Sequence, residues 1–309
     1  MSTTELNLAG LPAAPPETLL RVVWKRLSRS WISLAALVVV AAYILLGLAA
    51  LTPAMERLVN NPVGGSYDPP HWGSPAVWFG TDILGRSVFW RTLYGARVAL
   101  ILTFCTGALS LGIGTLLGTV AGYFGGWIDV IIVWLFTTVS SIPWLLLVLA
   151  LAYVLSSRPA LAENYDGLPV IIVSLGLTDW VTLCRLLRGE VLKHRDRDYV
   201  TSARAAGANH GRIIFRHILP NISHLIVITF SLSAVSYVQA EVVLTFVGLG
   251  ISSKPSWGRM IDDARLELLR GVWWQLTAAT IAIFILCLAL NILGDDLRDA
   301  LDPRLRNVS

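Results

Sequence analysis

The chain has 309 residues, of which 55% are hydrophobic and only 14% are charged. Soluble domains carry about 25% charged residues, so this composition argues against an ordinary soluble protein. The net charge is +4, but no basic stretch interleaved with aromatic residues accompanies it, so a nucleic-acid partner is not expected. Cys105, Cys184 and Cys287 lie far apart without metal-ligand or disulfide spacing, and we interpret them as packing residues in helices.

Long stretches without Asp, Glu, Lys or Arg indicate the class of fold. A helix needs about 20 apolar residues to cross a bilayer core of about 30 Å. Several stretches are long enough alone, and others become so once Asp179 and Glu241 are included. Runs of this length are hard to bury in a soluble core, so we predict an all-α polytopic membrane protein with six transmembrane helices. The uncharged stretches are 31–55, 98–128, 130–157, 167–178, 221–240, 242–253 and 271–294.

The first third of the chain divides into three parts. We expect residues 1–30 to form a cytoplasmic N-terminal arm and residues 31–52 to form the first transmembrane helix. A cleaved signal peptide would carry its positive charge nearer the start and have a shorter apolar run. Residues 53–96 are rich in Pro, Gly and Trp and are predicted to be an extracytoplasmic segment, with a short helix near 86–94.

Residues 97–294 are predicted to form a five-helix core. Its spans are expected at 98–121, 128–155, 168–187, 223–249 and 272–293, with a kink at Pro143 and a cytoplasmic tail at 295–309. In the first of these spans and just after it, glycines recur every four residues, which places them on one helical face where a neighbouring backbone can approach closely. These glycines are Gly114, Gly118, Gly122 and Gly126.

The distribution of basic residues sets the predicted orientation. Six spans with a cytoplasmic N-terminus place 15 Lys and Arg residues inside and 9 outside. The excess inside agrees with the positive-inside rule, although long loops count little in that rule.

The loop 188–221 carries the strongest functional signal. Tyr199, Ser202, Ala203 and Ala206 fall on one face of a short helix, and small residues there permit close docking of a partner. Gly207 is suited to the left-handed conformation that ends a helix.

A second helix follows in the same loop. Asn209 can cap its start, and a largely apolar stripe is expected to end at Pro220; it consists of Ile213, Ile214, His217 and Ile218. A helix lying on anionic lipid is the alternative, but such helices favour Leu, Phe and Trp on the buried face rather than Ala.

This loop resembles the integral membrane permeases of bacterial ABC importers. Their signature is a small-residue pair, three residues and a glycine, followed by Ile-x-Leu-Pro. Here Ser202-Ala203 precedes Gly207 at that spacing, although Ser202 replaces the usual alanine and no acidic residue directly precedes it. The resemblance implies a type I importer permease fold and a cytoplasmic coupling helix that docks into a groove of an ATPase subunit. The implied docking residues are Tyr199, Ser202, Ala203, Ala206, Gly207, Ile218, Leu219 and Pro220.

Three further stretches narrow the resemblance to the C-type permeases of dipeptide, oligopeptide and nickel importers. These stretches are 79–86, 246–250 with Trp257-Gly258, and 291–304, and the similarity spans about residues 20–306. It implies a bacterial inner-membrane protein that pairs with a second homologous permease. Its other partners would be two cytoplasmic ATPases, which bind ATP and magnesium, and an extracytoplasmic binding protein. The chain itself is expected to need no cofactor and to bind no metal.

The sequence leaves two other functional classes to consider. No phosphate-binding loop, His-Glu-x-x-His metal site or nucleophile elbow occurs, which argues against an enzyme within the membrane. An ion-coupled carrier or channel finds its support in Asp179 and Glu241, because ionisable residues inside spans are costly and often functional. We therefore consider both as candidates for the translocation pathway, with helix packing through a hydrogen bond as the alternative for Glu241. The cargo stays open among peptides, nickel complexes and oligosaccharides.

Overall fold

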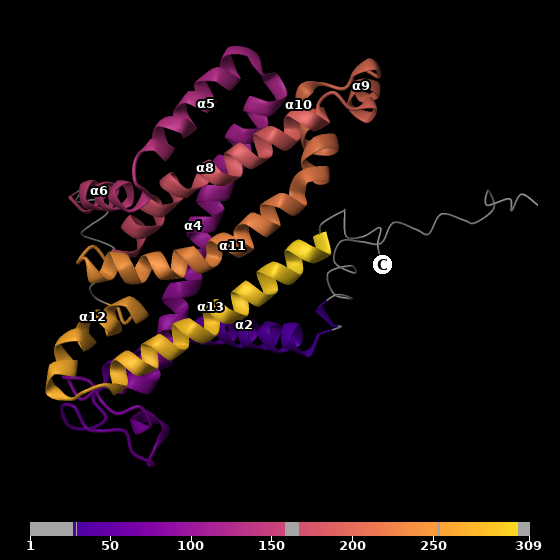
Figure 1. Ribbon diagram of the computed structural model, residues 1–309. Coiled ribbons are helices and arrows are strands. Elements are labelled where there is room, and N and C mark those ends of the chain that lie inside the picture. The colour runs from indigo at the N-terminus through magenta and orange to yellow at the C-terminus, as the bar shows by residue number, and fades with distance from the viewer. Residues whose placement is uncertain (1–26, 29, 158–166, 252–253, 302–309) are drawn as a thin grey trace, which may run out of the picture.

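The computed structural model describes residues 27–28, 30–157, 167–251 and 254–301 (Figure 1). Most of the predicted N-terminal arm and the last eight residues of the predicted tail lie outside these ranges. Every element in the described ranges is helical, which agrees with the predicted all-α fold. Five of the helices are long and apolar enough to cross a membrane. They are α2 (Trp31–Ala49), α4 (Val88–Phe124), α8 (Leu168–His194), α11 (Leu219–Phe246) with the turn that precedes it, and α13 (Trp274–Leu301).

Helix α4 is longer than predicted and connects the two ends of the molecule. The sequence indicated a short helix near 86–94 and a separate span from 98, whereas the structure has one helix of 37 residues, about 55 Å long. Ser87 caps its start by accepting a hydrogen bond from the amide of Trp90. At the other end, the Tyr123 hydroxyl lies 2.9 Å from Nδ1 of His210. The predicted boundary between the extracytoplasmic segment and the five-helix core, at residues 96 and 97, therefore falls inside α4.

The glycine stripe of α4 packs against the backbone of α8. A Cβ atom at Gly114, Gly118 or Gly122 would lie 2.6–2.8 Å from a backbone carbonyl oxygen of α8. The expected close approach is therefore confirmed for these three positions. Gly126 does not take part, because it begins the next helix with a φ of +56° and faces open space.

The third predicted span is broken rather than kinked. Helices α5 (Gly126–Ser141) and α6 (Trp144–Ser156) meet at an angle of 94°, and Figure 1 shows α6 turning sharply away from α5. Proline disfavours the helical conformation of the residue before it, and Ile142 accordingly has extended backbone angles. The count of six spans holds only if this bent pair is one crossing.

A further group of short elements packs against one end of α4 and α13. They are α3 (Pro53–Asn60), η2 (Pro75–Val77), α12 (Trp257–Glu267) and η4 (Leu268–Arg270). We call residues 53–87 and 254–272 the cap. The cap lies at the end of α4 opposite α9 (Asp198–Ala205) and α10 (His210–Ile213) (Figure 1).

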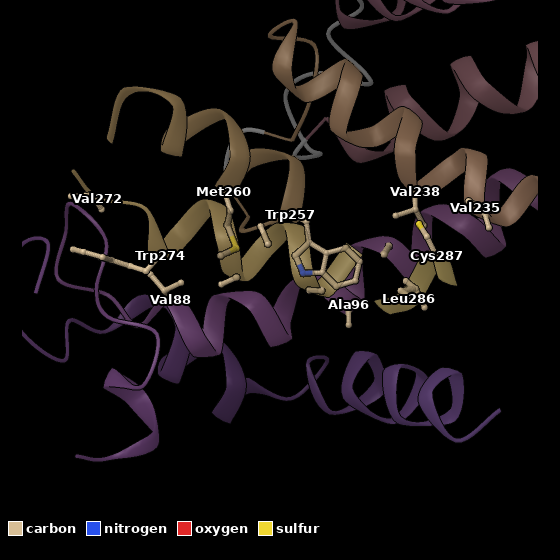
Figure 2. Packing of buried hydrophobic residues seen from close by; sticks show 14 residues of the cluster. Val88, Ala96, Val235, Val238, Trp257, Met260, Val272, Trp274, Leu286 and Cys287 are labelled. Carbon is tan, nitrogen blue, oxygen red and sulfur yellow. The ribbon is translucent and has the colours of Figure 1, made fainter. Parts of the chain in front are cut away.

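The largest buried cluster joins the cap to the long helices. Figure 2 shows its side chains, with Trp257 and Met260 of α12 among residues of α4, α11 and α13. The Trp257 indole donates a hydrogen bond of 2.8 Å to the carbonyl of Thr92 and packs edge-on against Tyr43 of α2. This core therefore fixes α12 relative to the membrane helices.

Candidate functional site

Asp82 organises the loop that precedes α4. Its carboxylate is 1% exposed and accepts hydrogen bonds of 2.9 Å from the amides of Leu84 and Arg86. It also pairs with the guanidinium groups of Arg86 and Arg91. The indole of Trp274 donates 2.9 Å to the carbonyl of Thr81 next to it. The motif at 79–86 thus holds the cap onto α4 and α13, and sequence reasoning had singled it out only through resemblance.

The cap also contains a cluster of carboxyl groups on α12. Glu267 is 4% exposed, and one of its carboxyl oxygens has no hydrogen-bond partner among the described residues. Burial raises the pKa of Glu267 to about 7, and the neighbouring Asp263 adds to that rise. Near neutral pH, Glu267 therefore carries a substantial protonated fraction.

Glu241 holds α12 against α11. Its carboxylate is 4% exposed and accepts hydrogen bonds from the hydroxyl of Thr245 at 3.0 Å and the amide of Gly258 at 3.2 Å. A Cβ at Gly258 would lie 2.8 Å from that carboxylate, which explains the glycine after Trp257. The carboxylate thus satisfies a free amide in the first turn of α12. This position favours a packing role over the pathway role considered from the sequence.

Asp179 lies instead on a groove between α8, α11 and α13 that has both apolar and polar lining residues. The groove has a volume of about 600 Å³, and Glu241 does not line it. Its polar side chains come from three helices, and the apolar ones are mostly from α11. The polar residues that line it include Asp179, Thr182, His224, Thr229, Ser233 and Arg298.

Three hydroxyl groups converge on the Asp179 carboxylate. Tyr237 donates to Oδ2 at 2.6 Å, and Ser110 and Ser233 donate to the same oxygen at 3.3 Å. Ser110 lies on α4, whereas the other two lie on α11. Sequence reasoning identified Asp179 but missed these donors. The spacing of Ser233 and Tyr237 by four residues in an apolar span is the signal that could have found them.

The loop between α8 and α11 forms the predicted helix–glycine–helix elbow. α9 is followed by Gly207, whose φ of +79° confirms the predicted left-handed turn. Asn209 then accepts a hydrogen bond of 2.8 Å from the amide of Arg212 and caps α10, as predicted.

The implied docking residues divide into exposed and supporting groups. Ser202, Ala206, Gly207 and Pro220 are exposed, and Ala203 and Leu219 are half-buried. Tyr199 is also half-buried, with its hydroxyl 2.7 Å from Nδ1 of His194. Ile218 is fully buried with Val200 and Ile213 beneath the elbow. Ile218 can therefore support the surface but cannot itself contact a partner.

The second helix of the elbow does not end at Pro220. It continues from α10 through a π-turn at Ile214–Ile218 into α11, where Pro220 occupies the first turn. The prediction that the apolar stripe stops at this proline was wrong. The amide of Leu219 bonds to the carbonyl of Ile214, and a proline is tolerated in the first turn of a helix. The elbow is thus continuous with α11, one of the three helices that line the groove.

Long apolar helices, a groove that contains a carboxylate and an exposed elbow together define a polytopic membrane protein of the transport class. Residues 114–307 match the family model described as binding-protein-dependent transport system inner membrane component. The chain belongs to this family, whose members are membrane permease subunits of ABC transporters. It is accordingly a multi-pass protein of the bacterial inner membrane.

Individual relatives cover nearly the whole chain. The dipeptide transport system permease protein DppC of Bacillus subtilis is 36% identical over 92% of this chain and 85% of its own length. The oligopeptide transport system permease protein OppC of the same organism is 32% identical over 92% of this chain and 90% of its own length. The glutathione transport system permease protein GsiD of Pectobacterium atrosepticum is 34% identical over 93% of this chain and 92% of its own length. The similarity to C-type permeases inferred from four motifs is confirmed.

Proposed function

We propose that this chain forms half of the translocation pathway for peptides in an ATP-driven importer. The other half is a second homologous permease. Two cytoplasmic ATPases bind ATP and magnesium, and an extracytoplasmic binding protein delivers the peptide. The chain itself hydrolyses no ATP and holds no cofactor. The relatives named for dipeptide, oligopeptide and glutathione transport support a peptide cargo over the other candidates.

The observation that carries the proposal is the continuity between the elbow and the groove. α8 carries Asp179 and ends four residues before α9, whereas α11 carries Ser233 and continues from α10. A partner that moves α9 and α10 therefore moves α8 and α11, two of the three helices that line the groove. The exposed small side chains of Ser202 and Ala206 permit a partner to approach the elbow closely.

Co-purification of the ATPases with a tagged permease tests this role. Ala206→Arg places a long charged side chain on the exposed face, and Gly207→Val forces a β-branched residue into a left-handed turn at a cost of about 1–2 kcal/mol. We expect both variants to insert into the membrane, lose bound ATPase and lose peptide uptake.

Arg212→Ala provides the matched control. Arg212 is exposed on α10 in the same elbow, and exposed ion pairs contribute less than about 1 kcal/mol. This variant should keep most ATPase recovery and uptake. Normal recovery and uptake in the Ala206 and Gly207 variants would show that the elbow is not the docking surface.

The energy source separates an importer from an ion-coupled carrier, the class that Asp179 alone would favour. Peptide uptake should persist when an uncoupler collapses the proton gradient while ATP is maintained, and should stop when ATP is depleted. The opposite pattern would identify a secondary carrier.

A further inference from the structure

The groove contains a carboxylate without a cationic partner. None of the ion pairs among residues 27–28, 30–157, 167–251 and 254–301 involves Asp179, although it lies in a membrane-spanning helix. Ionisable side chains inside spans are costly and usually pair with an opposite charge or face a water-filled cavity. Asp179 faces the groove, so a mobile cation can supply the missing partner.

The hydrogen bonds around Asp179 occupy one of its carboxyl oxygens and leave room for a ligand at the other. The three hydroxyl donors, from Ser110, Ser233 and Tyr237, all reach Oδ2. A carboxylate has about four acceptor sites on its two oxygens, so Oδ1 keeps its capacity to accept. The donors come from α4 and α11, which fixes the carboxylate at the meeting point of three helices.

The other residues that line the groove limit which kind of cation can bind at Asp179. Asp179 is the one carboxylate among its lining residues, and the basic residues of that lining are His224 and Arg298. His224 and Ser233 are nine residues apart on α11, which corresponds to about 14 Å along the helix. The negative charge therefore lies well away from His224. No group of three or more His, Cys, Asp or Glu residues suited to a metal ion occurs in the described ranges.

We propose that Asp179 binds the terminal ammonium group of a peptide during its passage, an inference that rests on the proposed function. An ammonium group donates three hydrogen bonds and needs only one carboxylate for charge compensation. A groove of about 600 Å³ is within the usual range for small-molecule sites. A single contact of this kind also suits a transport path, because binding there must be weak enough for release.

Protection of an introduced thiol tests ammonium binding directly. Ser236 is exposed, lines the groove and lies one helical turn from Ser233. Ser236→Cys is combined with Cys105→Ser, since Cys105 is the exposed native cysteine and Cys184 and Cys287 are buried. The complete complex is held in lipid nanodiscs, and maleimide alkylation is timed with millimolar trialanine or N-acetyl-trialanine.

Trialanine should slow alkylation, and N-acetyl-trialanine, which has no ammonium group, should not. Asp179→Asn preserves the shape and an acceptor, and should raise the half-protecting concentration of trialanine about tenfold, the effect of one charge-assisted hydrogen bond. Asp179→Glu keeps the charge and should retain protection. Tyr237→Phe removes the shortest hydrogen bond to Oδ2 and should retain the preference for the free amine.

Several results would overturn the ammonium site. They are equal protection by both peptides, protection by neither, equal protection by sodium chloride, and an unchanged half-protecting concentration of trialanine in the Asp179→Asn variant. A thiol at position 236 that does not react without peptide would show that the groove holds no solvent, which also overturns it. Uptake of trialanine is measured separately. Normal ATP-dependent uptake without protection refutes only this site, whereas protection without uptake refutes the importer role.

Discussion

The close contact between α4 and α8 predicts a sharp difference between two glycines of the same helix. A Cβ at Gly118 would lie 2.6 Å from the carbonyl oxygen of Cys184, a backbone atom that cannot rotate away. A Cβ at Gly112 meets nothing within 4 Å. Both positions are inside α4, so Gly→Ala removes the same conformational freedom from the unfolded chain in each case.

The magnitude follows from two opposing effects. Replacing glycine with alanine in a helix interior stabilises the helix by about 0.8–1.0 kcal/mol at either site. Overpacking typically costs about 1–3 kcal/mol, and only Gly118→Ala incurs it. The gain in helix stability is the same for both variants and cancels when they are compared. The free energy of unfolding of Gly118→Ala should therefore be lower than that of Gly112→Ala by about 1–3 kcal/mol.

Reversible unfolding of the purified permease in mixed detergent micelles measures this difference. The free energy of unfolding is compared for the two alanine variants and the unmodified chain. We expect Gly112→Ala to match or exceed the unmodified chain and Gly118→Ala to fall below Gly112→Ala. Equal unfolding free energies for the two variants would refute the backbone contact between α4 and α8.

Three further predictions concern the cap and the orientation of the chain. Glu241→Gln should retain uptake because glutamine keeps the shape and one acceptor oxygen for the amide of Gly258, while the Thr245 hydroxyl can accept from the new amide group; Glu241→Ala should destabilise the protein, and equal thermal stability of both variants would contradict this role. Because the pKa of Glu267 is raised to about 7, its contribution to stability is complete below its unfolded pKa and is lost as pH rises through 7. Glu267→Gln should therefore flatten the pH dependence of the unfolding free energy above pH 5 and raise stability at pH 8. An unchanged pH dependence would contradict the raised pKa of Glu267. Cysteines at the exposed positions Ser66 and His210 should react with an impermeant reagent from opposite sides of the membrane, and labelling of both from outside would exclude the six-span topology.

The sequence predicted some features closely and misjudged others for identifiable reasons. The turn at Gly207 and the cap at Asn209 were predicted because both depend on residues within one or two turns of the chain. The break at Pro143 and the passage through Pro220 were misjudged because a proline can either end a helix or occupy the first turn of the next one, and its presence alone does not decide between the two. The docking role of the elbow and the orientation of the chain stay predictions.

By itself, the sequence determined that this is a helical membrane protein with an elbow between two of its spans. Those features follow from apolar run length and local backbone preference, which need no knowledge of distant contacts. Only the tertiary structure separated the two carboxylates inside the spans. Glu241 meets the first turn of α12 and is buried, whereas Asp179 meets hydroxyls from α4 and α11 on an open groove. Their partners lie up to 69 residues away in the chain, so side-chain burial and charge compensation there depend on how the helices pack.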